Sequence, residues 1–204
     1  MKKRILVIGI TMAAAGSEKS FLSFANTIDY EKYDVDLLLA RKTGGFLPLV
    51  PEKIRILEMG ALGELFEINR KNARSVILKR YLLKNPFRCF GLFPHLMKIK
   101  RAENPERRSF AANRMWLSMM EKMPDFPGEY DIALAYWGDR TMFYMIDKVH
   151  AKRKIAWLHF DYSRPPREDA LYREYFRRCD KVVTVSTEIE KSLKLSLIHI
   201  SEPT

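Results

Sequence analysis

The chain has 204 residues, of which 47% are hydrophobic and 12% aromatic, so it can bury a sizeable core as one domain. Its formal net charge of +11 at pH 7 indicates a surface that attracts anions such as phospholipid headgroups, nucleic acid or phosphorylated substrates. The two cysteines, Cys89 and Cys179, lie far apart and outside any CxxC or Cys/His cluster, so the sequence indicates neither a disulfide framework nor a zinc site.

The amino-terminal part of the chain alternates between strand and helix patterns. A continuous apolar run predicts a strand over residues 4–10, and apolar residues at helical spacing predict a helix over 17–28. Residues 33–40 and 53–57 predict two further strands, with a turn at 43–45 between them. Strands that alternate with helices imply a parallel sheet with helices on both faces.

The alternation stops over residues 62–125, approximately, and this segment is interpreted as a helical insertion. Apolar spacing predicts helices over 70–83 and 107–123, separated by the stretch from Pro86 to Pro105.

Alternation then resumes in the last part of the chain. The predicted elements are a strand over 130–137, a helix over 141–150, a strand over 154–159, a helix over 168–178 and a strand over 181–186. The whole pattern predicts an α/β protein with a doubly wound, parallel, Rossmann-like sheet and a helical insertion, formed by residues 1–194.

The two ends of the chain need separate interpretations. Residues 1–17 have a basic start, an apolar stretch and small residues at the end, as a signal peptide does, but the pattern that follows favours a first strand and helix. Residues 195–204 (LSLIHISEPT) follow the in-frame translation of a transposase-type sequencing adapter, so we expect a non-native tail without function.

No apolar run reaches the roughly 18 residues of a membrane span, so we expect a soluble or peripheral protein.

The turn between the first strand and the first helix, AAGSEKS, is the first candidate site. Such a turn brings backbone N–H groups and the positive end of the helix dipole to the carboxyl edge of the sheet, where phosphate binds well. The candidate residues are Gly16, Ser17 and Glu18. The alternative is a structural role in which Ser17 caps the helix. Neither the dinucleotide motif GxGxxG nor the P-loop motif GxxxxGK[ST] fits the spacing here.

The second candidate site follows a later strand, in the segment WLHFDY. Because the carboxyl ends of parallel strands surround one crevice, we expect His159 and Asp161 to face the same crevice as Gly16. A histidine there can bond a sugar hydroxyl or transfer a proton at neutral pH, so His159 is the candidate catalytic residue. The alternative is a structural histidine that ends a buried strand.

The helical insertion is strongly basic, with Glu103 and Glu106 as its only acidic residues between positions 70 and 108. Apolar and aromatic residues are interleaved with the basic ones, as on a surface that lies among anionic headgroups. The candidate membrane-facing residues are Lys79, Arg80, Lys84, Arg88, Phe90 and Phe93. The alternative is a solvated basic face over a small helical core. No RNA-binding signature is present, so no nucleic-acid partner is expected.

With these features placed, the chain resembles the family 4 glycosyltransferases of bacterial capsule and cell-surface polysaccharide pathways. The matching segments are KKRILVIGI, AGSEKS, DYEKYDVDLLLA, YDIALAYW, KIAWLHFDYS and CDKVVTVSTEIEKSL. They cover nearly the whole chain before residue 195, and the helical insertion matches least.

The resemblance implies the amino-terminal half of a GT-B fold, whose first domain binds mainly the acceptor and whose second binds mainly the sugar nucleotide. The family's first turn typically reads GGxE, in which Ala15 here replaces the first glycine while Gly16 and Glu18 match. His159 corresponds to a histidine near the transferred sugar, and Ser186 to the serine that closes the first domain. Transfer proceeds with retention and usually without a metal, so neither a metal nor a cofactor is expected.

The family's donor-binding motif, a pair of spaced glutamates in the second domain, has no counterpart in this chain. The resemblance therefore implies a fragment without its donor domain, inactive alone. The parent enzyme would move a sugar from a nucleotide-sugar donor to a lipid-linked or polysaccharide acceptor in surface glycan biosynthesis. We expect it in the cytoplasm, peripheral to the inner face of the plasma membrane. The alternative is a non-catalytic basic α/β module that binds membrane or nucleic acid.

Overall fold

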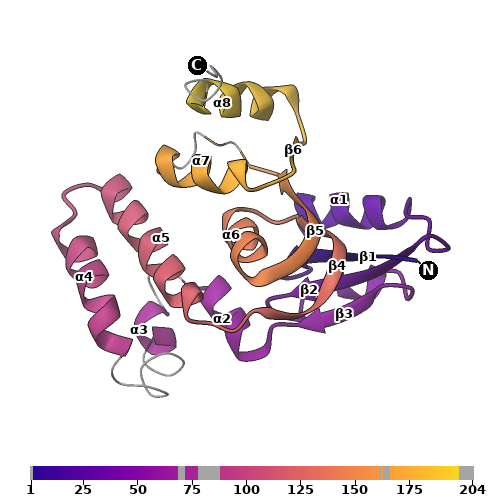
Figure 1. Ribbon diagram of the computed structural model, residues 1–204, viewed down its shortest axis with the longest axis horizontal. Coiled ribbons are helices and arrows are strands. Elements are labelled where there is room, and N and C mark those ends of the chain that lie inside the picture. Colours follow the sequence, from indigo (N-terminus) through magenta and orange to yellow (C-terminus); the bar gives the residue numbers. More distant parts are fainter. Residues whose placement is uncertain (1, 69–71, 78–87, 161, 163–165, 198–204) are drawn as a thin grey trace.

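The computed structural model describes residues 2–68, 72–77, 88–160, 162 and 166–197 (Figure 1). Six parallel strands form one sheet in the order β3-β2-β1-β4-β5-β6. The strands are β1 (Lys3–Gly9), β2 (Tyr33–Leu39), β3 (Arg55–Glu58), β4 (Phe126–Ala135), β5 (Val149–Leu158) and β6 (Lys181–Thr184). This order is that of a doubly wound, Rossmann-like fold, so the predicted fold class is confirmed.

Strand β1 lies in the middle of the sheet, where it pairs with β2 on one side and β4 on the other. Its apolar run is continuous because both of its faces are buried. Ile5 and Val7 belong to one core cluster, and Leu6 and Ile8 belong to the other. The segment with signal-peptide features thus supplies the central strand of the fold.

Helices cover both faces of the sheet. Helix α1 (Gly16–Ala25) packs on one face through Phe21 and Ala25, which are fully buried. The other face carries α5 (Pro105–Glu121), α6 (Asp139–Lys148) and α7 (Asp169–Arg177). Phe143 of α6 lies at the centre of this second core, with its ring centroid 4.5 Å from that of Tyr175 in α7.

The chain leaves the sheet between β3 and β4. It forms η2 (Gly60–Leu62), α2 (Gly63–Phe66), α3 (Ala73–Val76) and α4 (Arg88–Arg101) before α5. Figure 1 shows α4 and α5 side by side, standing away from the sheet. The carbonyl end of α2 is held from two sides, because Trp116 Nε1 of α5 donates to the Leu65 carbonyl at 2.8 Å and Arg140 Nη1 of α6 donates to the Phe66 carbonyl at 2.6 Å.

The stretch from Pro86 to Pro105, predicted to separate two helices, instead contains helix α4, and that prediction was wrong. Pro94 lies inside α4, where it removes one backbone donor. Packing outweighs this cost, since Leu92 is 1% exposed and α4 lies along α5.

Several predicted bounds were displaced by a few residues. Strand β5 begins at Val149, five residues before its predicted start, because the exposed residues His150, Lys152 and Arg153 hide the strand pattern. Strand β4 likewise begins four residues early, at Phe126. Of the helix predicted over 70–83, the structure describes α3, and the rest lies largely outside the described residues.

Helix α8 (Thr187–Leu197) follows β6, and the Ser186 hydroxyl caps it by accepting from the Ile189 N–H at 3.2 Å. The tail predicted to be non-native begins inside α8, and residues 198–204 lie outside the described part of the chain. Within the described part, no helix is both long and apolar enough to cross a bilayer.

Candidate functional site

The order of the strands reverses between β1 and β4, at the middle of the sheet. Open parallel sheets bind ligands in the crevice outside the carboxyl ends of the strands at such a point. The residues that follow β4 and β5, together with the start of α1, surround this position. We call them the switch-point site: Gly16, Ser17, Glu18, Ser20, Tyr136, Trp137 and His159.

Helix α1 begins at the switch-point site without a side-chain cap. Its N-cap residue is Ala15, in an extended conformation with φ −132° and ψ 174°, and no side chain accepts from the first turn. The Ser17 hydroxyl donates to the Glu18 carboxylate at 2.6 Å, so the interpretation of Ser17 as a helix cap was wrong. The positive end of the α1 dipole is therefore left for another acceptor.

The space beside Gly16 is open. A Cβ atom added at Gly16 would meet no atom within 4 Å, whereas one added at Gly44 would lie 2.1 Å from the Met12 carbonyl carbon. Gly44 has φ 126° and lies in the loop that pairs with the chain beyond β1, where the Met12 N–H donates to the Thr43 carbonyl at 2.8 Å. This loop fixes the backbone that leads into the start of α1.

His159 lies directly after β5 and is half-buried. Its ring centroid is 4.6 Å from that of Tyr136 and 6.3 Å from that of Trp157, which it stacks on at 11°. Its Nε2 atom is buried and has no hydrogen-bond partner among the residues that the structure describes. A buried polar atom without a partner is uncommon in proteins, so Nε2 is a group that a ligand can satisfy.

Electrostatics connect His159 to the first turn of α1. Burial lowers the pKa of His159, and the negative charge of Glu18 opposes that shift. Glu18 itself is only 5% exposed. The structure therefore brings Glu18 and His159, predicted as parts of two separate motifs, into one site, with the imidazole neutral at pH 7.

Tyr136 and Trp137 are site residues that the sequence interpretation missed. The hydroxyls of Tyr136 and Ser20 lie 2.9 Å apart, and burial raises the pKa of Tyr136, an effect that the hydrogen bond between the two hydroxyls partly offsets. The ring centroid of Trp137 lies 5.0 Å from that of Tyr136. The Trp137 Nε1 is a buried donor without a described partner. The signal was present in YDIALAYW, as two aromatic residues directly after a buried strand.

The loop between β5 and α7 is tied to the start of α6. The Arg167 side chain is 6% exposed, and its Nε lies 3.3 Å from an oxygen of Asp139. The Arg167 guanidinium also lies 4.1 Å from the centroid of the Phe160 ring and donates to the Tyr162 carbonyl at 2.8 Å. These contacts hold the residues on both sides of position 161. Asp161 itself, predicted to lie in the cleft, is outside the described residues.

The structure places only part of the predicted membrane-facing set. Lys79, Arg80 and Lys84 lie outside the described residues, as do the side chains of Arg88 and Phe90 in α4. Phe93 is described, and it is 62% exposed, with Leu96 one turn away at 44%. Apolar side chains of α4 therefore face the surroundings of the protein.

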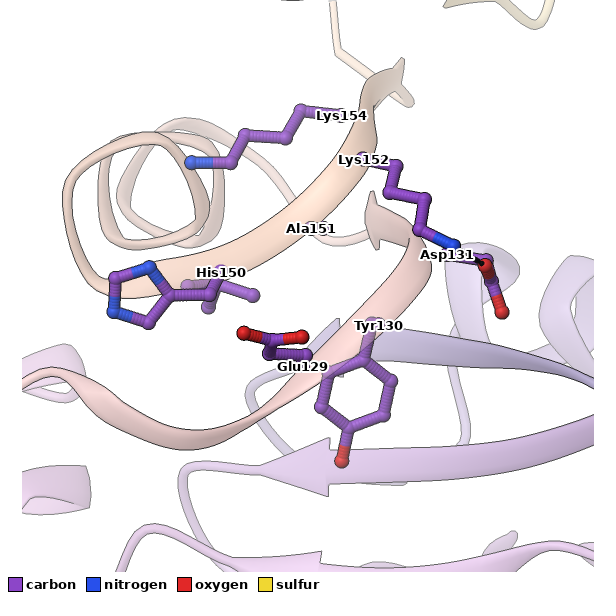
Figure 2. Close-up of a pocket in the computed structure, with 8 residues that line it drawn as sticks. Glu129, Tyr130, Asp131, His150, Ala151, Lys152 and Lys154 are labelled. Carbon is purple, nitrogen blue, oxygen red and sulfur yellow. Dashed lines mark hydrogen bonds and ion pairs between the residues drawn. The ribbon is translucent and has the colours of Figure 1, made fainter.

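A cavity of about 480 Å³ lies at the opposite edge of the sheet, near the amino ends of β4 and β5 (Figure 2). Its two lysines already have partners in the protein, since Lys152 Nζ donates to Asp131 at 2.7 Å and Lys154 Nζ donates to the Ile146 carbonyl at 2.8 Å. The lysines of this cavity are therefore not free to bind a ligand.

Comparison with models of known protein families gives no match. Comparison with curated proteins gives no relative either. In the described part of the chain, no group of three or more His, Cys, Asp or Glu side chains is placed to hold a metal ion.

Proposed function

We propose that this chain is the acceptor-side domain of a retaining glycosyltransferase with a GT-B fold, and that its switch-point site faces a nucleotide-sugar donor. The observation that carries the proposal is the Nε2 atom of His159, which is buried and has no described partner. The imidazole also lies close enough to Glu18, in the first turn of α1, for the charge of Glu18 to oppose the lowering of its pKa by burial. A neutral imidazole and an uncapped helix start on one sheet edge suit a sugar hydroxyl and a phosphate.

Each part of the site has a role in this proposal. The open space at Gly16 admits the donor, and the start of α1 stabilises the negative charge that develops on the leaving diphosphate. His159 hydrogen-bonds a hydroxyl of the transferred sugar through Nε2. Tyr136, held by Ser20, fixes the plane against which the imidazole lies.

The acceptor is proposed to be a lipid-linked or growing glycan at the inner face of the plasma membrane. Support comes from the basic insertion and from the exposed apolar side chains of Phe93 and Leu96 on α4. The donor domain would lie on the polypeptide encoded downstream of residue 194. By this proposal the 204-residue chain binds part of the reactants and transfers no sugar alone.

The decisive experiment extends the gene into the genomic DNA that follows the Lys194 codon and assays the longer protein with a panel of nucleotide sugars. We expect sugar transfer by the extended protein and none by the present chain. His159→Ala should lower kcat by about 100-fold. His150→Ala is the matched control, because His150 is 63% exposed and lies at the opposite edge of the sheet.

The main alternative is a non-catalytic basic α/β module that binds membrane or nucleic acid, and the exposed apolar residues of α4 favour it too. It predicts that the extended protein has no transferase activity and that His159→Ala and wild type behave alike. Vesicle flotation and an RNA gel shift then identify the target. Sugar transfer by the 204-residue chain alone would overturn our proposal that the active site also needs a separate donor domain.

A further inference from the structure

A groove of about 1070 Å³ lies between α4 and α5 and extends to the amino-terminal end of α7. This volume is slightly above the usual range of about 300–1,000 Å³ for pockets that hold small molecules. Its apolar lining comes from both helices and includes Phe93 and Met97 of α4 and Phe110 and Ala111 of α5. The groove is separate from the switch-point site and shares no residue with it.

The charges of the groove are concentrated at one end. Lys98 and Arg101 lie near the end of α4, and Arg107 lies near the start of α5, so all three are close to the turn that joins the helices. Lys98 and Arg101 make no ion pair with the residues that the structure describes. Arg107 pairs with Glu103 at 3.7 Å, but both side chains are mostly exposed, and such pairs contribute little.

The other end of the groove is neutralised within the protein. Arg114 of α5 makes a bidentate pair with Glu168, with N–O distances of 2.6 and 2.9 Å. Between the two ends lies His95, whose Nδ1 is buried and has no described partner. The groove thus has a free positive end, an apolar middle and one buried polar atom that a ligand can satisfy.

From this polarity we propose that the groove binds one anionic lipid molecule, with its phosphate among Lys98, Arg101 and Arg107 and its hydrocarbon chain along Phe93, Met97 and Phe110. The cations bind the phosphate through charge complementarity, and the hydrocarbon chain buries the apolar lining. The proposal gives a chemical class to the lipid-linked acceptor and rests on the proposed function for that role. Lipid binding is measured without sugar transfer, so failures of the two proposals are distinguishable.

The exposed side chains next to the groove support a lipid taken from a membrane. Phe93 and Leu96 place apolar surface in contact with solvent beside the free cations. Inorganic phosphate would leave this surface in water, and nucleic acid would leave the apolar lining unfilled. A bilayer surface accommodates both the cations and the apolar side chains.

The test titrates the full chain with dodecyl phosphate by calorimetry, beside inorganic phosphate and dodecyl maltoside. Flotation with phosphatidylcholine vesicles, with and without phosphatidylglycerol, measures binding at a membrane. We expect dodecyl phosphate to bind at least about tenfold more tightly than either comparison ligand, because only it uses both ends of the groove. Flotation should require the anionic lipid.

Variants separate binding in the groove from general attraction to a basic protein. Lys98→Gln with Arg101→Gln should weaken dodecyl phosphate binding about tenfold. Lys3→Gln with Lys191→Gln removes the same charge at exposed sites that do not line the groove and should change the binding of dodecyl phosphate less than about twofold. Ala111→Trp fills the groove while keeping every cation and should abolish binding, with circular dichroism to verify folding.

Phe93→Ser is a second variant of the apolar lining. It should leave the fold intact, because a side chain that is 62% exposed contributes little to stability. It should weaken flotation while leaving the melting temperature unchanged. Three results would overturn the proposal: equal losses in the two double variants, inorganic phosphate binding as tightly as dodecyl phosphate, or RNA binding that dodecyl phosphate does not displace.

Discussion

The rings of Tyr136 and His159 lie 4.6 Å apart between centroids, at an interplanar angle of 40°, just beyond the ends of the neighbouring strands β4 and β5. Tyr136 is fully buried and its hydroxyl is bound to Ser20 of α1. The position of the imidazole is thus set by three elements of the fold. A side chain held in this way is preorganised for binding.

The hydrogen bond between Ser20 and Tyr136 is expected to stabilise the fold by about 1 kcal/mol. Tyr136→Phe keeps the aromatic packing and removes this bond, as does Ser20→Ala from the other side. Urea unfolding of both variants and of the double variant should give a coupling energy of about 1 kcal/mol. Strictly additive losses would mean that the two hydroxyls do not interact in solution.

The pKa of His159 is expected to lie below 6.5, because burial disfavours the imidazolium and Glu18 only partly offsets this. Glu18→Gln should lower it further, since the substitution removes the negative charge. NMR titration of the imidazole measures both values, with Glu31→Gln on the exposed surface as the control. The unfolded chain takes up the proton at higher pH, so this residue lowers stability progressively as the pH falls below about 6.5.

Two glycines near the site should respond differently to substitution. Gly44→Ala is expected to destabilise the protein by about 1–3 kcal/mol, because the new Cβ would lie 2.1 Å from Met12 backbone atoms at a φ of 126°. Gly16→Ala should change stability by less than about 0.5 kcal/mol, since the added carbon meets open space. Thermal melts of the two variants, measured together, give the comparison. Similar losses in both would contradict an open space at Gly16.

Arg140 is expected to hold the helical insertion to the sheet. Its Nη1 donates to the carbonyls of Leu65, Phe66 and Ile68 at 3.3, 2.6 and 3.1 Å. Arg140→Met should destabilise the protein by about 2–4 kcal/mol, because these acceptors lose a charged donor. Arg153→Met, on the exposed part of β5, should be close to neutral in the same chemical unfolding experiment.

The thiol of Cys179 should react slowly with alkylating reagents at pH 8. Burial raises its pKa to about 11, so little thiolate is present. The measurement uses Cys89→Ser so that one thiol is followed, and the rate is compared with that of the urea-unfolded chain. A folded rate equal to the unfolded one would show that this cysteine is accessible and ionised.

The fold was predictable because its central strands, β1 and β2, are buried along most of their length and leave strongly apolar runs. Helix α4 was missed because Pro94 and neighbouring basic residues obscure its apolar spacing, and its stability comes from α5, which no local pattern reveals. Strand β5 was predicted short for a related reason, since its first residues are polar at the exposed edge of the sheet.

The candidate site was predictable in part. The rule that strand ends share a crevice predicted that His159 faces the same crevice as Gly16, but it did not predict the contribution of Glu18 to the environment of His159. The roles of Ser20 and Tyr136 depend on a contact across 116 positions of sequence, which one chain does not reveal. The groove between α4 and α5 was equally hidden, because it exists only once the unpredicted helix packs.

Both outer strands of the sheet, β3 and β6, contain four residues each. Short edges expose few free backbone groups, and Lys181 adds positive charge at β6, whereas Arg55 of β3 is paired with Asp36. A second chain therefore finds little on which to extend the sheet. This architecture opposes aggregation by strand addition, so concentrated solutions should remain free of amyloid-like assemblies while the chain stays folded.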